Sequence, residues 1–520
     1  MTPHLATARH VLVVGNGMGG ARLAEELRQR DPDAAALRVT VVGEESHAAY
    51  NRILLSAVVA GTITPRETRL KPDGWWAAHH VDVRTGWRVT RVDTDARTAT
   101  VCRVGPAGLD ADSGEQLAYD ELVLATGSTA HVPPVAGAEF HDPGVVAFRS
   151  LDDCDRLVRS AASATHAVVV GGGLLGIEAA RGLLLRGLRV TVVHPRSHPM
   201  ERQVDSDGGR ILATVLRRTG AELVLGRRAT ALQQGPDGRR LLLDDGSSLP
   251  CDLLVLAAGV RPRTDLAAAL GAHTARGIVV DDRLATSVPH VHAVGECVEH
   301  RGEVYGLVQP GWEQARVLAD VLSGADATAR YEGTAALTRL KVHDIDLTCM
   351  GEVDADLHDD EHEVVTVADP RRGHYAKLVV RGDRVVGAVL LGGGDVTGAV
   401  SQLFDTGDPV PVDRVALLLG RSTRPDQALD AASLAPMPGS VVLCRCNTVT
   451  KSALVDAWRA GATSRPQIAA ATRATTGCGS CASAVDGLCS WLRSNEPDDP
   501  RASTPSPAAR PEPALSEGAA

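Results

Sequence analysis

The stretch that decides the fold is VLVVGNGMGG at residues 11–20. A short β-branched run leads into a glycine turn, and the turn opens a segment with helical spacing of apolar residues. Gly15 permits the tight turn, Gly17 lets a pyrophosphate approach the backbone, and Gly20 lets the helix pack closely on the sheet. The helix N-terminus favours the phosphate charge. This order of features predicts a dinucleotide site, whereas GxGxxG alone would fit any glycine-rich turn.

The next strand supports this interpretation. It reads VTVV at residues 39–42 and ends just before Glu44. An acid at the end of the second strand can accept hydrogen bonds from a ribose diol. We therefore expect Glu44 to bind the ribose of the first dinucleotide.

A second fingerprint, VVVGGGLLGIE at residues 168–178, repeats the pattern. Its turn glycines are Gly171, Gly173 and Gly176. The following strand ends at His194 and lacks the acid, while Arg196 lies two residues further on. An acid there favours NAD, and a nearby arginine can accommodate the 2′-phosphate of NADP, so the choice between NADH and NADPH stays open.

Two fingerprints in one chain point to one resident and one exchanging nucleotide, FAD with NAD(P)H. Three further motifs resemble the flavoprotein reductases with a glutathione-reductase-like fold. They are YDELVLATGS at 119–128, CDLLVLAAGVRP at 251–262 and TSVPHVHAVGE at 286–296. The resemblance implies an α/β fold with two Rossmann-like dinucleotide-binding domains, an α+β interface domain and, at the C-terminus, a small helical domain.

The resemblance also implies cofactor-binding roles. In the second FAD motif Glu296 would bind the ribityl chain and Gly295 would let the backbone come close; an exposed turn acid is the alternative for Glu296. Glu178 would face the nicotinamide, unless it serves helix packing or capping. The remaining cofactor-binding residues implied by the motifs are Thr126, Gly127 and Gly259.

The stretch YNRILLS at residues 50–56 contains no cysteine. In disulfide reductases of this fold the redox-active cysteines lie here, so thiol–disulfide catalysis is not expected. The stretch instead resembles electron-transferring members, including the flavin portion of the nitrite reductase large subunit. Arg52 would then contact FAD near its flavin end, the alternative being a surface arginine. Arg52 and Glu178 are the two candidate catalytic residues.

Five of the ten cysteines lie between residues 444 and 489. Two thiolate pairs give four soft ligands, which suit zinc or an iron–sulfur cluster. The segment resembles the bacterioferritin-associated-ferredoxin-like domain, which implies a [2Fe-2S] cluster; zinc or an unmetallated role are the alternatives. The ligands would be Cys444, Cys446, Cys478 and Cys481, with Cys489 a buried helix residue.

The predicted domains follow from these motifs. An FAD-binding domain would combine residues 1–149 with 281–330 around an NAD(P)H-binding domain at 150–280. An interface domain at 331–415, a linker at 416–440, the cluster domain at 441–492 and a disordered tail at 493–520 would complete the chain. The formal net charge of -10 argues against a nucleic-acid partner. With no signal peptide and no long apolar run, we expect a cytoplasmic protein that does not enter a membrane.

The predicted function is transfer of electrons from NAD(P)H through FAD and a [2Fe-2S] cluster to a separate protein acceptor. The resemblance favours the electron-transfer component of assimilatory nitrate or nitrite reductase, with a molybdenum nitrate reductase as the partner. A ferredoxin or rubredoxin reductase with an appended cluster, or a redox-sensing regulatory flavoprotein, are the alternatives. The interface domain leaves a homodimer open.

Overall fold

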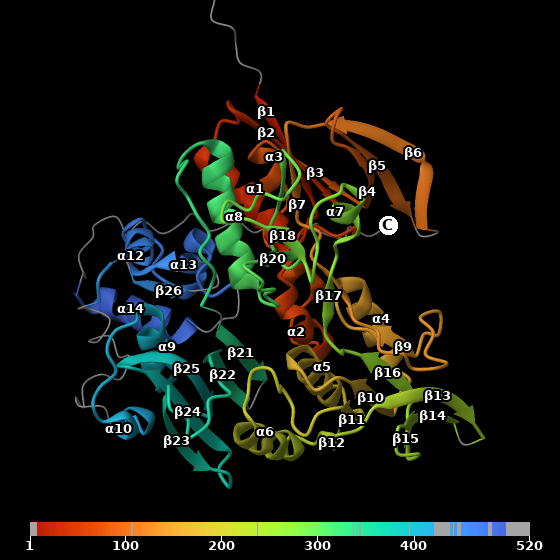
Figure 1. Ribbon diagram of the computed structural model, residues 1–520, viewed down its shortest axis with the longest axis vertical. Helices are drawn as coiled ribbons and strands as arrows, with labels where there is room; N and C mark the ends of the chain where they lie inside the picture. The colour runs from red at the N-terminus through yellow and green to blue at the C-terminus, as the bar shows by residue number, and fades with distance from the viewer. Residues whose placement is uncertain are drawn as a thin grey trace, which may run out of the picture. The chain divides into compact units, whose positions relative to one another are not determined.

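The computed structural model describes residues 8–105, 108–236, 238–335, 337–342, 345–394, 396–420, 437–439, 441–444, 449–476 and 481–495. The chain forms two compact units, Met1–Arg424 and Pro425–Ala520, and each is described by itself. Figure 1 shows the elements of both units. Within the described residues, no helix combines the length and the apolar character needed to cross a membrane.

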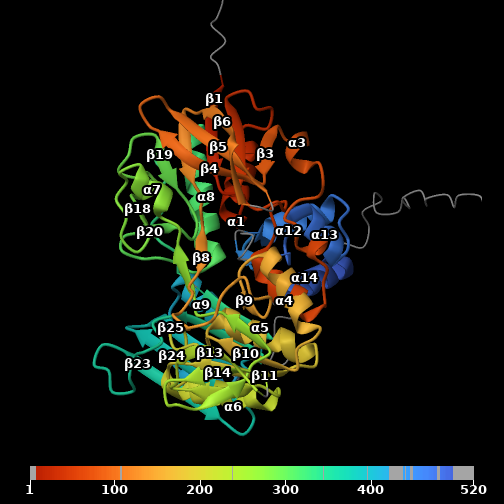
Figure 2. The same ribbon diagram turned by 90° about the vertical axis from the view of Figure 1, so that its right-hand side faces the viewer.

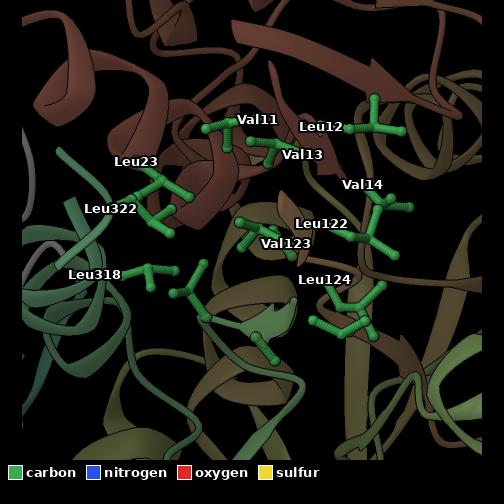
Figure 3. Packing of buried hydrophobic residues seen from close by; sticks show 14 of the residues in the cluster. Val11, Leu12, Val13, Val14, Leu23, Leu122, Val123, Leu124, Leu318 and Leu322 are labelled. Atoms are coloured by element: carbon green, nitrogen blue, oxygen red, sulfur yellow. The ribbon is translucent and has the colours of Figure 1, made fainter. Parts of the chain in front are cut away.

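The first unit begins with a five-stranded parallel sheet in the order β19-β7-β1-β2-β3. Its strands are β1 (Arg9–Val14), β2 (Leu37–Gly43), β3 (Val81–Thr85), β7 (Glu121–Leu124) and β19 (Val291–Ala293). Helices α1 (Met18–Arg30) and α8 (Val308–Ser323) pack against each other and contribute to the same core. Because helices cover a parallel sheet, its strands read as continuous apolar runs. Figure 3 shows side chains of β1, β7, α1 and α8 gathered in this core.

A second five-stranded parallel sheet has the order β12-β11-β10-β16-β9. Its strands are β9 (Val145–Ala147), β10 (His166–Val170), β11 (Arg189–His194), β12 (Glu222–Leu225) and β16 (Leu253–Leu256). The helices of this part are α4 (Leu151–Ala161), α5 (Leu174–Leu185) and α6 (Ser206–Arg218). The two parallel sheets confirm the predicted α/β fold with two Rossmann-like domains.

Short elements surround the two sheets. Antiparallel sheets are formed by β4 (Trp87–Asp93), β5 (Thr98–Gly105) and β6 (Gly108–Ala118), and by β13 (Ala229–Gly235), β14 (Gly238–Leu243) and β15 (Ser248–Pro250). Two-stranded pairs are β8 (Ser128–Ala130) with β17 (Val260–Pro262), and β18 (Ile278–Val280) with β20 (Val298–His300). The remaining helices are η1 (Arg52–Leu54), α2 (Leu55–Ala60), η2 (Pro65–Thr68), α3 (Trp75–Ala78) and α7 (Asp265–Ala269).

The third part of the first unit is an antiparallel sheet in the order β21-β22-β25-β24-β23. Figure 2 shows its strands β23, β24 and β25 side by side. Its strands are β21 (Leu337–Val342), β22 (Ile345–Gly351), β23 (Glu363–Asp369), β24 (His374–Arg381) and β25 (Arg384–Leu391), followed by α9 (Val396–Thr406) and α10 (Arg414–Leu418). Strands β24 and β25 form a hairpin in which Arg381 pairs with Arg384, as the turn residues between them predict. This α+β part corresponds to the predicted interface domain.

Residues before 281, the predicted point of return to the first domain, contribute to the core of the first sheet. Ala267, Ala272 and Ile278 are buried in the core cluster that contains Val11 and Leu12. Their side chains therefore add to the hydrophobic core of the first sheet rather than to that of the second. We propose that the first domain resumes near α7, and that the nucleotide-binding domain begins at β9, a few residues before 150.

The second unit contains β26 (Val442–Cys444), β27 (Val449–Thr450), α12 (Lys451–Arg459), α13 (Arg465–Thr472) and α14 (Ala482–Asn495). Helices α12 and α13 lie between the two cysteine pairs and are separated by a turn at Gly461, which has a positive φ. They pack with α14 around one small apolar core. Residues 421–436 and 440 of the predicted linker lie outside the described residues. The tail was predicted to begin at residue 493, but α14 continues to Asn495; from residue 496 onward the predicted tail also lies outside the described residues.

Candidate functional site

The first glycine turn is closed at two positions and open at one. Gly15 has φ +122°, and a Cβ there would lie 2.0 Å from Ala125 O. A Cβ on Gly20 would lie 1.9 Å from Gly15 O, so only glycine lets α1 pack this closely on the turn. At Gly17, by contrast, an added Cβ would meet no atom within 4 Å. The turn therefore leaves space for a ligand at the position where a dinucleotide fold receives the pyrophosphate.

The side chain of Asn16, which lies between the first two turn glycines and has no counterpart in the sequence motif, is a second feature of this site. Both polar atoms of its amide are buried, and neither has a hydrogen-bond partner among the described residues. Its Cβ lies close to Gly43, where an added Cβ would be 2.5 Å away. A buried amide without partners costs about 1–3 kcal/mol, so it fits a site completed by the polar groups of a bound nucleotide.

Glu44 follows β2 directly, as predicted, and is held by two arginines. It forms an ion pair with Arg88, and Arg263 Nη1 donates to its other oxygen at 2.9 Å. Burial alone would raise the pKa of Glu44, but hydrogen bonds and charge from these arginines outweigh it and hold the pKa below the ordinary value. Glu44 is therefore an ionised acceptor at the end of the second strand, as binding of a ribose diol requires.

The second glycine turn repeats the geometry of the first. Gly171 has φ +126° and an added Cβ would lie 2.2 Å from Ala257 O. A Cβ on Gly176 would lie 2.0 Å from Gly171 O, whereas Gly173 has no atom within 4 Å of its added Cβ. The same pattern of two filled positions and one open position indicates a second dinucleotide site.

The residues after β7 and β16 join the two sheets. Strands β8 and β17 pair as an antiparallel ribbon. Arg263 N donates to Gly127 O at 2.9 Å, and Thr126 Oγ1 donates to Arg263 O at 2.8 Å. On the other side of the ribbon, His131 N donates to Gly259 O at 2.8 Å. The two ATG-like segments predicted from the sequence thus meet in one connection between the nucleotide-binding domains.

Gly295 and Glu296 lie where the start of α8 approaches the first turn. Gly295 N donates to Gln314 Oε1 at 2.8 Å. Glu296 accepts a hydrogen bond from Ser128 Oγ at 2.5 Å and forms an ion pair with Arg149. Ser128 directly follows the predicted cofactor-binding residues Thr126 and Gly127, so its role near Glu296 could have been inferred from the sequence. Nothing in the sequence around Arg149 indicates that this residue pairs with Glu296.

Arg52 lies in η1 and connects the two domains. Its Nη1 donates to Tyr50 Oη at 2.8 Å and to Arg149 O at 3.0 Å, and it forms an ion pair with Glu45. Tyr50 Oη in turn donates to Glu45 Oε2 at 2.6 Å. The guanidinium is therefore fixed inside a polar network rather than free on the surface. Its contact with flavin stays a prediction.

The thiols near this stretch are poor nucleophiles. Cys154 Sγ lies 3.8 Å from Leu55 O, and burial raises the pKa of this thiol to about 12. Burial also raises the pKa of Cys297, which follows Glu296 and is fully buried. A thiol that stays protonated does not attack a disulfide or accept electrons from a flavin. This agrees with the absence of cysteine between Tyr50 and Ser56.

Glu178 occupies the face of α5 that packs on α2. One turn further along the helix, an added Cβ on Gly182 would lie 2.9 Å from Val59 Cγ1. Residues four apart share a helix face, so Glu178 is turned toward the same side. Burial raises the pKa of Glu178 to about 8. The side chain is therefore largely protonated at neutral pH and can donate a hydrogen bond from its carboxyl group.

The second unit brings two of the predicted cluster ligands into one core. Cys444, at the end of β26, is fully buried, and Cys481, just before α14, is 4% exposed. Both belong to the same apolar core cluster as Trp458. Cys446 and Cys478 lie outside the described residues. Cys489 is a buried residue of α14, as predicted.

Comparison with known proteins agrees with both sites. Residues 9–317, more than half of the chain, match the pyridine nucleotide-disulphide oxidoreductase model. Residues 442–490 match the BFD-like [2Fe-2S] binding domain, and residues 337–402 match the rubredoxin NAD+ reductase C-terminal domain. These matches assign FAD and NAD(P)H to the first unit and a [2Fe-2S] cluster to the second.

Two curated relatives come from Bacillus subtilis. The chain is 36% identical over 482 residues to a nitrite reductase [NAD(P)H], covering 92% of this chain and 57% of the relative. It is 34% identical over 505 residues to an assimilatory nitrate reductase electron transfer subunit, covering 96% of this chain and 61% of the relative. The chain thus spans about three fifths of the length of either relative.

Solved structures share the fold of the first unit. A ferredoxin reductase from Rhodopseudomonas palustris has a TM-score of 0.66 at 27% identity, over 82% of this chain and 98% of that one. Putidaredoxin reductase in its covalent complex with putidaredoxin has a TM-score of 0.69 at 24% identity, over 80% and 99%. From its glycine turns, its sheets and these matches, the chain belongs to the pyridine nucleotide-disulphide oxidoreductase family.

Proposed function

We propose that this protein passes electrons from NAD(P)H through FAD and a [2Fe-2S] cluster to a separate redox protein. The observation that carries the proposal is the pair of glycine turns, each open only at its second glycine and joined by the β8–β17 ribbon. Such a pair provides one site for a resident nucleotide and one for an exchanging nucleotide. The cysteines of the second unit supply the ligands for a metal centre.

Each set of residues has a distinct task in this proposal. The first turn, Glu44 and Glu296 hold FAD, and the second turn holds NAD(P)H. Bound FAD would accept two electrons as a hydride and release them one at a time, which is chemistry that the protein's side chains cannot supply. Arg52 fixes the segment between the two domains, and protonated Glu178 offers a hydrogen-bond donor on the α2 side of α5. The cofactor-binding residues, as predicted, are Gly15, Gly17, Gly20, Glu44, Arg52, Thr126, Gly127, Gly171, Gly173, Gly176, Gly259, Gly295 and Glu296.

The relatives support a role in nitrate or nitrite assimilation. One is named as an electron transfer subunit of assimilatory nitrate reductase, and another as a nitrite reductase [NAD(P)H]. We propose a nitrate reductase as the acceptor, because one relative is named an assimilatory nitrate reductase electron transfer subunit. Binding of a molybdenum enzyme, a cytoplasmic location and a homodimer all remain parts of this proposal.

The test is an anaerobic titration of the full chain with NADH and NADPH, followed by visible and EPR spectroscopy. We expect the flavin band to bleach and a reduced [2Fe-2S] signal to appear with the same reductant. Flavin bleaching without a cluster signal would contradict the proposed electron path. An absence of bleaching with both reductants would contradict the NAD(P)H site itself.

A second candidate is a reductase for ferredoxin or rubredoxin. It is favoured by the match of residues 337–402 to the rubredoxin NAD+ reductase C-terminal domain and by the fold shared with ferredoxin reductases. Steady-state rates with ferredoxin, rubredoxin and nitrate reductase as acceptors separate the two candidates. Faster reduction of a small iron–sulfur protein than of nitrate reductase would favour this second function.

A further inference from the structure

The loop after β11 folds back onto the second glycine turn. Met200 N donates to Gly172 O at 2.9 Å, so residues six or seven positions beyond the strand return to its end. His194, the last residue of β11, packs directly beneath the same glycine: an added Cβ on Gly172 would lie 2.8 Å from His194 Cγ. The loop therefore brings side chains from residues near 200 to the end of β11, the position at which the fingerprint lacks an acidic residue.

His194 links the glycine turn to Glu201. Gly172 N donates to His194 Nδ1 at 3.1 Å, and a backbone N–H can only donate. Nδ1 is therefore the acceptor, so the proton of the neutral ring lies on Nε2. Nε2 is 2.9 Å from Glu201 Oε2 and donates to it. Burial lowers the pKa of His194 despite the opposing effect of Glu201, which keeps the ring neutral near pH 7.

This arrangement fixes a carboxylate beside the end of the second strand. The Glu201 side chain is 29% exposed, and the structure gives its Oε1 no hydrogen bond among the described residues. In a dinucleotide-binding fold the adenosine ribose lies against the end of the second strand, where an acid accepts its hydroxyl hydrogens. Glu201 supplies that acid from seven residues further along the chain.

The basic residues near this position are placed less favourably for a phosphate. Arg227 Nε donates to Asp245 Oδ2 at 2.7 Å, so its charge is already paired. Arg196 is exposed, and its backbone oxygen accepts from Gly226 N at 2.8 Å. A 2′-phosphate on the ribose would therefore face the fixed Glu201 carboxylate, and the exposed Arg196 is a candidate counter-charge.

We propose that Glu201, held by neutral His194, makes the nucleotide site specific for NADH by accepting hydrogen bonds from the adenosine ribose and repelling a 2′-phosphate. The inference rests on the proposed function, because it assigns the exchanging nucleotide to the second turn. It resolves the choice between NADH and NADPH that the sequence pattern leaves open.

The experiment compares Glu201→Gln with the wild-type holoprotein. Glutamine can still accept from His194 through its amide oxygen, so the substitution removes charge with little change in shape. Glu222→Gln is the matched control, since Glu222 is exposed at the opposite end of the adjacent strand pair, where its Oε2 accepts from Thr191 Oγ1 at 3.1 Å. Two readouts are used: stopped-flow flavin reduction by NADH and NADPH, and calorimetric binding of ADP-ribose and its 2′-phosphate.

We expect wild type to prefer NADH by at least tenfold and to bind ADP-ribose more tightly than its 2′-phosphate. Glu201→Gln should reduce both preferences by about tenfold, and Glu222→Gln should leave them unchanged. A wild-type preference for NADPH that is lost in Arg196→Ala would overturn the inference, as would unchanged preferences in Glu201→Gln. If ADP-ribose binds selectively while neither nucleotide reduces the flavin, the inference stands and the proposed function fails.

Discussion

The open position of the first turn gives a direct test of the FAD site through Gly17→Ala. Gly17 has φ -84° and ψ -169°, a conformation that alanine adopts without strain. Its Cβ would meet no protein atom within 4 Å. The substitution should therefore leave the folded protein intact and place a methyl group only in the path of the dinucleotide pyrophosphate.

Gly17→Ala should stabilise the folded protein and weaken FAD binding. Replacing glycine by alanine in a compatible conformation raises the free energy of unfolding by about 0.4–1 kcal/mol, because the unfolded chain has fewer conformations. Forcing one methyl group into a packed contact costs about 1–3 kcal/mol. At about 1.4 kcal/mol per factor of ten, FAD affinity should fall by roughly 5- to 150-fold.

The assay measures FAD dissociation by fluorescence and the thermal midpoint of the apoprotein. Gly20→Ala is the contrasting variant, because its Cβ would lie 1.9 Å from Gly15 O and the backbone must move. It should lower the stability of the apoprotein by about 2 kcal/mol or more. Gly173→Ala should weaken NAD(P)H binding while leaving FAD content unchanged.

Unchanged FAD affinity in Gly17→Ala, with normal apoprotein stability, would refute the assignment of the first turn to the FAD pyrophosphate. Equal loss of stability in Gly17→Ala and Gly20→Ala would refute the distinction between an open and a filled position.

Three further predictions address separate parts of the molecule. Burial raises the pKa of Glu178 from 4.5 to about 8, so the free energy of unfolding should fall by about 4 kcal/mol as pH rises from about 4.5 to 8. Glu178→Gln should remove this pH dependence, which denaturant melts at both pH values would measure. Lys377 is 5% exposed and donates to Asp205 Oδ2 at 2.9 Å, so Lys377→Met should lower stability by about 3 kcal/mol or more, and an unchanged melting curve would count against this buried pair. Cys444→Ser should abolish the reduced-cluster EPR signal without affecting flavin reduction by NAD(P)H, whereas Cys489→Ser should retain both.

The two nucleotide-binding domains were predictable because their turns require glycine at fixed positions in the sequence. A Cβ added to the first or third glycine of each turn would lie about 2 Å from a carbonyl oxygen, so no other residue fits there. The flanking strands are buried on both faces and read as apolar runs. An apolar run followed by glycines at fixed spacing therefore predicts both the turn and the strand that precedes it.

The contacts that sequence reasoning missed join residues far apart in the chain. Arg149 pairs with Glu296, and Tyr375 Oη donates to Asp205 Oδ2 at 2.6 Å. Neither pair has a characteristic spacing, because domain packing brings its members together. Glu201 was missed for a different reason: the loop after β11 reverses direction, so the acid follows its expected position by seven residues.

Rapid mixing of the oxidised holoprotein with one equivalent of NADH would show the order in which the flavin and the cluster receive electrons. Freeze-quenched samples would be followed by EPR while stopped-flow absorbance reports the flavin. We expect the flavin band to bleach first and the [2Fe-2S] signal to grow afterwards as the flavin partly recovers. A cluster signal that precedes flavin bleaching, or that never appears, would contradict it.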